Sequence, residues 1–160
     1  MCIRDSLKHE AEVFSQYQKE HGTSPLCDVV RWELEQQRRI VAHTRFTTTL
    51  APYASQFALE SWIIPNRQAQ SICDLNQEEI RSLADHIKGI TLGLGSSGLD
   101  FNFHLQEPIP GYPNHFYIKV APRVTIQAGF ELNTDIYINP VAPEFAAGWY
   151  RKYIKTPDAV

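Results

Sequence analysis

Two short segments in which apolar and polar residues alternate constrain the fold more than any other feature of this sequence. The apolar members are Phe101, Phe103 and Leu105, then Phe116, Ile118 and Val120; the polar members are Asn102, His104 and Gln106, then His115, Tyr117 and Lys119. A period of two places each apolar set on one face of a β-sheet and each polar set on the other. The Pro-rich segment 107–114 predicts a turn between two antiparallel strands, so that the polar side chains share one surface.

The rest of the chain predicts helices around a sheet. Residues 39–44, 46–50 and 57–64 are rich in Thr, Val, Ile and aromatic residues, which favours three more strands. Asn76 can cap a long helix, and Thr23-Ser24-Pro25 is a typical helix start. We further predict a helix over 7–22, a strand over 135–141 and a closing helix over 143–155. This order of elements predicts an α+β fold, an antiparallel sheet flanked by helices.

Residues 145–153 predict which side of the closing helix is buried. Its stripe consists of Phe145, Ala146, Trp149, Tyr150 and Tyr153.

Composition excludes several classes of protein. The 160 residues are 43% apolar, which is enough for one domain with a core. With 15 basic and 18 acidic residues the net charge is −3, so we expect no nucleic-acid partner. No apolar run approaches the roughly 20 residues that span a bilayer, so we expect no membrane partner. Three cysteines without metal-type spacing favour a reducing, cytoplasmic location, with Cys27 and Cys73 as packing residues.

The first six residues, MCIRDS, resemble an artefact of sequencing. The string ATG-TGT-ATA-AGA-GAC-AG, the end of a common transposase adaptor, translates into the first five of them and leads into the sixth. We therefore expect residues 1–6 to be foreign to the natural protein, and the natural reading frame to extend upstream of Leu7.

An ordered series of short segments resembles one known family. The segments are 39–41, 50–55, 59–65, 114–123, 128–131 and 138–141. Together they resemble the second half of galactose-1-phosphate uridylyltransferase and its relatives in the histidine-triad (HIT) superfamily, over about residues 24–141. The resemblance implies a HIT-like sheet, with 7–23 as a connecting helix from a missing N-terminal half and 24–157 as the C-terminal transferase domain.

The same resemblance implies a reaction. The intact enzyme, a homodimer, would move a uridylyl group from a UDP-sugar to a histidine and then to a hexose 1-phosphate. The family's nucleophile lies in the first half, in a His-Pro-His-x-Gln motif, and this sequence contains no His-x-His. Here Tyr117 stands at the nucleophile's position, and a phenol with a pKa near 10 is a poor nucleophile without an adjacent base. We therefore expect no catalytic residue in this chain and no activity from it alone.

Two sets of site residues follow from the resemblance. Ala128, Gly129, Phe130 and Glu131 match a loop that contacts the sugar phosphate at the partner subunit's catalytic half. Gly129 permits close backbone approach, and Glu131 can accept hydrogen bonds from sugar hydroxyls, or can instead cap a turn.

His104 and His115 match ligands of a structural zinc or iron, with further help from Glu10 or Glu12. The alternative is a hydrogen-bonded polar sheet face. Arg123 can bind phosphate or remain a solvated loop cation.

Two other functions stay open at this point. One is half of a phosphorylase acting on ADP-sugars or dinucleoside polyphosphates. The other is a stand-alone, degenerate HIT-like module that binds a nucleotide or a protein without catalysis.

Overall fold

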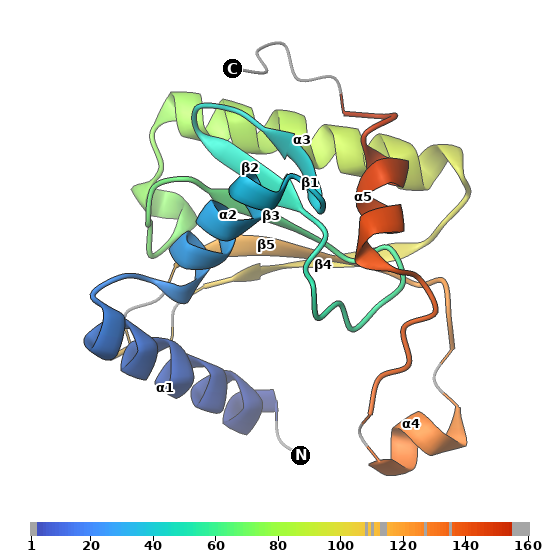
Figure 1. The fold of residues 1–160 in the computed structure, drawn as a ribbon, viewed down its shortest axis with the longest axis horizontal. Coiled ribbons are helices and arrows are strands. Elements are labelled where there is room, and N and C mark those ends of the chain that lie inside the picture. Colours follow the sequence, from blue (N-terminus) through green and yellow to red (C-terminus); the bar gives the residue numbers. More distant parts are fainter. Residues whose placement is uncertain are drawn as a thin grey trace.

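A single antiparallel sheet organises the molecule (Figure 1). The computed structural model describes residues 3–107, 109, 111–112, 115–126, 128–134 and 136–154, with side chains from residue 8 onward. The helices are α1 (Ile3–His21), α2 (Pro25–Gln36), α3 (Gln77–Ser96), α4 (Gly129–Thr134) and α5 (Pro143–Tyr150), with a 3-10 turn, η1 (Ile72–Asp74). The strands are β1 (Ile40–His43), β2 (Thr47–Leu50), β3 (Ser61–Pro65), β4 (Phe101–Gln106) and β5 (Tyr117–Pro122). Their order across the sheet is β1-β2-β3-β5-β4.

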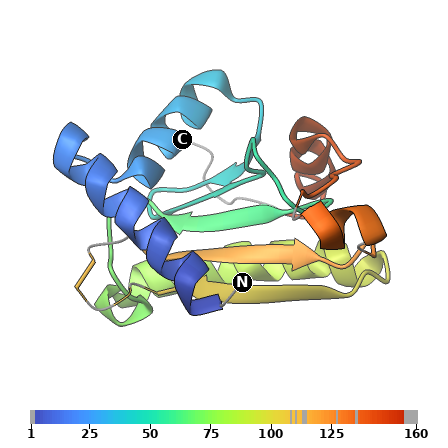
Figure 2. The ribbon, with the colours of Figure 1, turned by 90° about the horizontal axis from the view of Figure 1, so that it is seen from below.

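Helices cover both faces of the sheet (Figure 2). On one face, α3 and α5 pack over a core that includes Ile63, Ile90 and Ile118. On the other face, α2 packs over a smaller cluster that includes Leu26 and Ile64. The alternation of side chains along each strand therefore feeds two separate apolar layers. The α+β fold expected from the sequence is confirmed.

Local sequence explains where the helices begin. Asn76 caps α3, because its side chain accepts hydrogen bonds from the backbone N–H groups of Glu78 and Glu79, and the Glu79 carboxylate accepts one from the backbone N–H of Asn76. Pro25 opens α2 with a φ angle already suited to a helix. This helix ends at Gln36, and its C-cap residue Gln37 adopts a left-handed conformation with φ 55°.

The predicted hairpin is confirmed. β4 and β5 pair antiparallel, with His104 opposite Lys119 and Gln106 opposite Tyr117. Strand β4 lies at the edge of the sheet, and its apolar residue Phe103 is 52% exposed. The strand expected over 57–64 is shorter, because Leu59 turns the chain with φ 60° before β3 begins at Ser61.

Two expectations for the last third of the chain are wrong. The segment 136–141 is irregular and pairs with no described strand, and Asp135 lies outside the described residues. It is tied instead to the loop before β3, where the Asn139 side chain donates to the carbonyls of Ser55 and Phe57. In the closing helix, Phe145 points outward and is 64% exposed rather than part of the buried stripe.

Two predicted segments reach beyond the described residues: Met1 and Cys2 of the expected artefact, and Lys155 at the end of the predicted closing helix. Among the described helices, none is long and apolar enough to cross a membrane.

Candidate functional site

Tyr117 stands on the polar face of the sheet, beneath α1. Its side chain is 3% exposed, and its hydroxyl donates to the Glu10 carboxylate at 3.3 Å. Glu10 also accepts a hydrogen bond from Gln106, the residue opposite Tyr117 in the sheet. Burial raises the pKa of Tyr117 far above its usual value, and the nearby charge of Glu10 raises it further. The phenol is therefore held protonated, and a protonated phenol does not act as a nucleophile.

Lys119 and Glu60 form a buried ion pair next to Tyr117. Their charged atoms lie 3.0 Å apart, with 13% and 1% of the side chains exposed. Glu60 also accepts hydrogen bonds from the Trp62 indole and from the backbone of Gln56 and Phe57. Because several donors hold the Glu60 carboxylate in place, it fixes the position of the Lys119 ammonium on the polar face.

His104 shares this face with Lys119. Burial lowers the pKa of His104, the Lys119 charge lowers it further, and Glu60 and Glu10 act in the opposite direction. The imidazole is therefore favoured in its neutral form beside a fixed ammonium.

His115 lies elsewhere on the same side, against α2. Its Nε2 is 2.9 Å from the carbonyl oxygen of Pro65, and its Nδ1 is 3.6 Å from the sulfur of Cys27. A carbonyl only accepts, so Nε2 carries the proton and Nδ1 faces the thiol.

The two predicted metal ligands are thus not brought together. His104 faces Lys119, an ammonium that repels a metal cation, whereas His115 has its own partners. Within the described part of the chain, no three His, Cys, Asp or Glu side chains are grouped so as to hold a metal ion. These residues do not fit a shared zinc or iron, and metal binding stays a prediction without support from this geometry.

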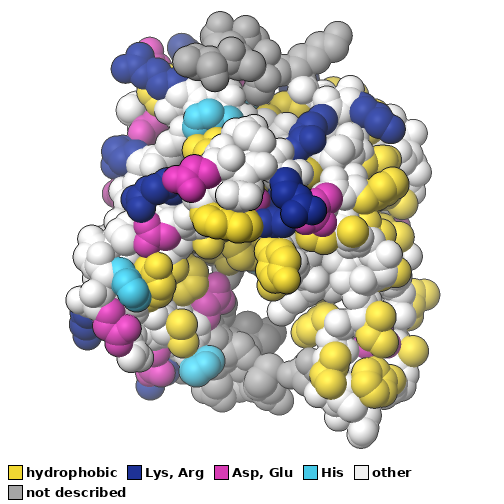
Figure 3. All heavy atoms as spheres, in the orientation of Figure 1, with side chains coloured by type: hydrophobic (Ala, Val, Ile, Leu, Met, Phe, Trp, Pro, Cys, Tyr) yellow, Lys and Arg dark blue, Asp and Glu magenta, His cyan; other side chains and the backbone are white. Residues whose placement is uncertain are grey.

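The segment between β5 and α5, residues 123–142, projects from the body as an apolar arm (Figure 1). Figure 3 shows hydrophobic side chains gathered on this projection. The large apolar residues that it exposes are Val124, Ile126, Phe130, Leu132, Ile136, Tyr137 and Ile138. An exposed apolar patch of this kind marks an interaction surface.

The predicted substrate residues lie on this arm, where α4 begins. Gly129 is the first residue of α4, and the Phe130 ring is 55% exposed. Glu131 accepts a hydrogen bond from the backbone N–H of Ala128 at 2.6 Å. One carboxylate oxygen therefore caps the first turn, as in the alternative we left open. The contact of Glu131 with a sugar stays a prediction.

A hollow of about 640 Å³ separates the arm from the end of the hairpin. Its walls include Asp100 and Asn102 from the hairpin side, Arg123 at the base of the arm, and Ile126 and Leu132 further along the arm. The exposed guanidinium of Arg123 brings the positive charge that a phosphate group requires.

Sequence reasoning left one residue of the polar face open and misplaced one residue of the arm. From the sequence alone, Glu60 could pair with a buried cation or face solvent, and the structure pairs it with Lys119. Asn139, which fastens the arm to the loop before β3, was taken for a strand residue. A single acid among apolar strand residues was the available signal for Glu60, whereas nothing local marked Asn139.

Comparison with known proteins identifies the relatives of this chain. No protein-family model matches it. A galactose-1-phosphate uridylyltransferase of Haemophilus influenzae is 31% identical over 145 residues, and an ADP-glucose phosphorylase of Arabidopsis thaliana is 25% identical over 141. The chain therefore has homologues named galactose-1-phosphate uridylyltransferase and ADP-glucose phosphorylase. These alignments cover 81% and 82% of the chain but only 41% and 38% of the two relatives.

Solved structures agree on the fold of this chain. A uridylyltransferase structure superposes with a TM-score of 0.81 and 19% identity, covering 93% of this chain and 50% of the other. A histidine triad nucleotide-binding protein from Candida albicans superposes at 0.51 with 12% identity, covering 65% and 80%. The sheet is therefore HIT-like, as the resemblance implied.

Proposed function

We propose that this chain supplies the C-terminal, substrate-contacting half of a hexose-1-phosphate uridylyltransferase of the UDP-glucose:galactose-1-phosphate type. The nucleophilic histidine belongs to the other half, and residues 7–23 connect the two. The enzyme works as a homodimer. The observation that carries the proposal is the apolar arm, which presents Gly129, Phe130 and Glu131 at a distance from the body of this chain.

The polar face of the sheet supports a role without covalent chemistry. At the nucleophile's position, Tyr117 is buried, and its hydroxyl donates a hydrogen bond to the Glu10 carboxylate. Lys119 is held by Glu60 and is not free to attack. This half is therefore suited to hold and shape substrate rather than to take up the uridylyl group.

The arm supports a role in contact with another half. Ile126 is 95% exposed and Leu132 is 72% exposed, which is costly in water unless another surface covers them. A partner subunit's catalytic half would cover this apolar surface and receive the Phe130 ring and the Glu131 carboxylate beside its bound sugar. Arg123 would add a positive charge near the sugar's phosphate.

The proposal includes a cytoplasmic location. It rests on the three cysteines of the sequence, an odd number without metal-type spacing, which is typical of a reducing compartment.

A phosphorylase is the second candidate, because the relative from Arabidopsis thaliana matches an equal share of this chain. Phosphate-dependent breakdown of ADP-glucose would distinguish it from exchange between UDP-glucose and galactose 1-phosphate.

The first test reads the DNA upstream of Leu7 in the source sample. An in-frame half with a His-x-His-x-Gln motif supports the proposal. A start codon close to Leu7, without such a half, overturns it in favour of a stand-alone module.

The second test measures activity. The purified chain should show no exchange between UDP-glucose and galactose 1-phosphate, whereas turnover by the chain alone would contradict the proposal. In the full protein, Glu131→Ala should raise the KM for hexose 1-phosphate by about tenfold, because a hydrogen bond to a charged group is lost. Glu78→Ala, which changes an exposed carboxylate in α3, is the matched control and should leave KM unchanged.

A further inference from the structure

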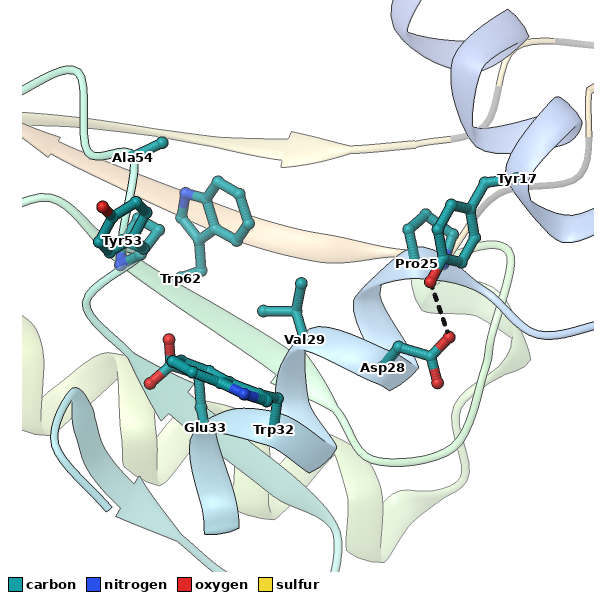
Figure 4. A pocket seen from close by; sticks show the side chains of 10 residues that line it. Tyr17, Pro25, Asp28, Val29, Trp32, Glu33, Tyr53, Ala54 and Trp62 are labelled. Carbon is teal, nitrogen blue, oxygen red and sulfur yellow. Dashed lines mark hydrogen bonds between the residues drawn. The ribbon is translucent and has the colours of Figure 1, made fainter. Parts of the chain in front are cut away.

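A separate pocket of about 530 Å³ opens between α2, the end of α1 and the loop before β3 (Figure 4). Four aromatic and two acidic side chains dominate its lining, and none of its lining residues is Lys, Arg or His. They are Tyr17, Trp32, Tyr53 and Trp62, with Asp28 and Glu33. The pocket therefore combines π-faces with two carboxylates, of which Asp28 pairs with Arg31 at 2.9 Å and Glu33 pairs with Arg39.

Two of the rings are open to solvent. Trp32 is 50% exposed and Tyr53 is 77% exposed, although both are large enough to be buried in a core. Figure 4 shows them with Trp62 around one end of the pocket, next to the carboxylate of Glu33. Rings in this position offer faces to a ligand.

Glu33 brings a buried and incompletely paired charge to this end. Only 3% of its side chain is exposed, and Oε1 accepts a hydrogen bond from Arg39 at 2.8 Å. Its second oxygen, Oε2, has no hydrogen-bond partner in the described part of the molecule. Arg39 also pairs with Glu144 at 2.7 Å, so one guanidinium serves two carboxylates, and its own Nη2 has no hydrogen-bond partner in the described part of the molecule.

The same rings already hold one cation. The Arg39 guanidinium carbon lies 5.1 Å from the centre of the Trp32 ring and 5.2 Å from that of Tyr53. These distances are within the range of cation–π attraction. The pair of rings is thus arranged to stabilise positive charge from one side, and their exposed parts remain open to a second cation.

We propose that this pocket binds a small organic cation, an alkylammonium whose methyl groups surround the nitrogen. The methyl groups would pack on Val29 and the rings, while the nitrogen's charge would face Glu33 and the π-faces. An inorganic cation would lose its water in so apolar a pocket, and the lining itself offers no basic side chain to a sugar phosphate. The binding is therefore distinct from the hexose-phosphate chemistry proposed for the arm.

The test compares two ligands of the same shape that differ in charge. Choline carries a trimethylammonium group, and 3,3-dimethylbutan-1-ol carries a neutral tert-butyl group in its place. Saturation-transfer NMR on the nine equivalent methyl protons reports the binding of each to the purified chain. Choline should bind saturably and at least about tenfold more tightly than the alcohol.

Variants locate the site. Trp32→Ala and Tyr53→Ala remove exposed rings and should each weaken choline binding about tenfold, with the fold unchanged by circular dichroism. Phe145→Ala removes another exposed ring, on α5 and outside the pocket, and should change nothing. Equal binding of the two ligands, no saturation with choline, or an effect of Phe145→Ala alone would overturn the assignment. None of these outcomes depends on transferase activity.

Discussion

The hydroxyl of Tyr150 donates a hydrogen bond to the backbone carbonyl of Leu59, 2.7 Å away and 91 residues earlier in the chain. Both residues are buried, and Leu59 holds the left-handed turn that precedes β3. Tyr150→Phe leaves that carbonyl without its partner inside the core. We expect the free energy of unfolding, measured with urea, to fall by about 1–3 kcal/mol.

Tyr53→Phe is the control for this change. It removes a hydroxyl from a side chain that is 77% exposed, so stability should change by less than about 0.5 kcal/mol. Equal effects of the two substitutions would mean that the Tyr150 hydrogen bond does not secure the turn.

Two glycines of α3 should respond to alanine in opposite directions. A Cβ on Gly93 would lie 2.8 Å from Cδ2 of Tyr153 and 3.3 Å from Cζ3 of Trp149, whereas a Cβ on Gly95 would meet nothing within 4 Å. Gly95→Ala should therefore stabilise the helix by up to about 1 kcal/mol. Gly93→Ala should lower the thermal midpoint, because overpacking by about 1–3 kcal/mol exceeds that gain. A rise in Tm for Gly93→Ala would show that α3 and the segment after α5 are not in contact.

His86 should make stability depend on pH. It is 2% exposed, its Nδ1 lies 2.7 Å from the Thr49 hydroxyl, and burial lowers its pKa to about 4. Between that value and the usual 6.5, the unfolded chain binds the proton more readily than the folded chain, so stability falls as pH drops from 6.5 toward 4. The loss from this residue is on the order of 3 kcal/mol.

His86→Gln should flatten this part of the pH profile in urea titrations at several pH values. The same substitution at the exposed His9 should leave the slope as it is. An unchanged slope in His86→Gln would place the pH dependence in other groups.

The two described cysteines should differ in reactivity. Burial raises the pKa of the Cys27 thiol, and the charge of Asp28 raises it further, whereas Cys73 is exposed. The thiolate is the reactive form, so iodoacetamide at pH 7.5 should label Cys73 well before Cys27, as read by peptide mass spectrometry. Faster labelling of Cys27 would instead mean that His115 activates it.

Local patterns predicted the parts of the fold that depend on neighbours in sequence. The alternation around His104 and Lys119 predicted the hairpin, and the capping residue Asn76 predicted the start of α3. The strand expected over 135–141 failed because alternation alone cannot supply a partner strand, and Asn139 bonds to a loop instead. Which distant side chains lie close together was harder to predict than which segments form strands.

The metal ligands show this limit. His104 lies opposite Lys119 in the sheet. His115 comes four residues before Lys119, which is roughly 13 Å along an extended chain. One face of a sheet can thus hold both histidines without bringing them near one another. The aromatic pocket was equally hidden, since Tyr17, Trp32 and Tyr53 come from three separate elements.

Strand β4 makes the isolated chain prone to aggregate. Its outer edge carries backbone N–H and C=O groups without a neighbouring described strand, and its six residues include no Lys, Arg, Asp or Glu to deter one. An uncharged edge beside the exposed Phe103 ring is a template for growth by strand addition from other molecules. We therefore expect aggregation of the isolated chain to begin at this strand.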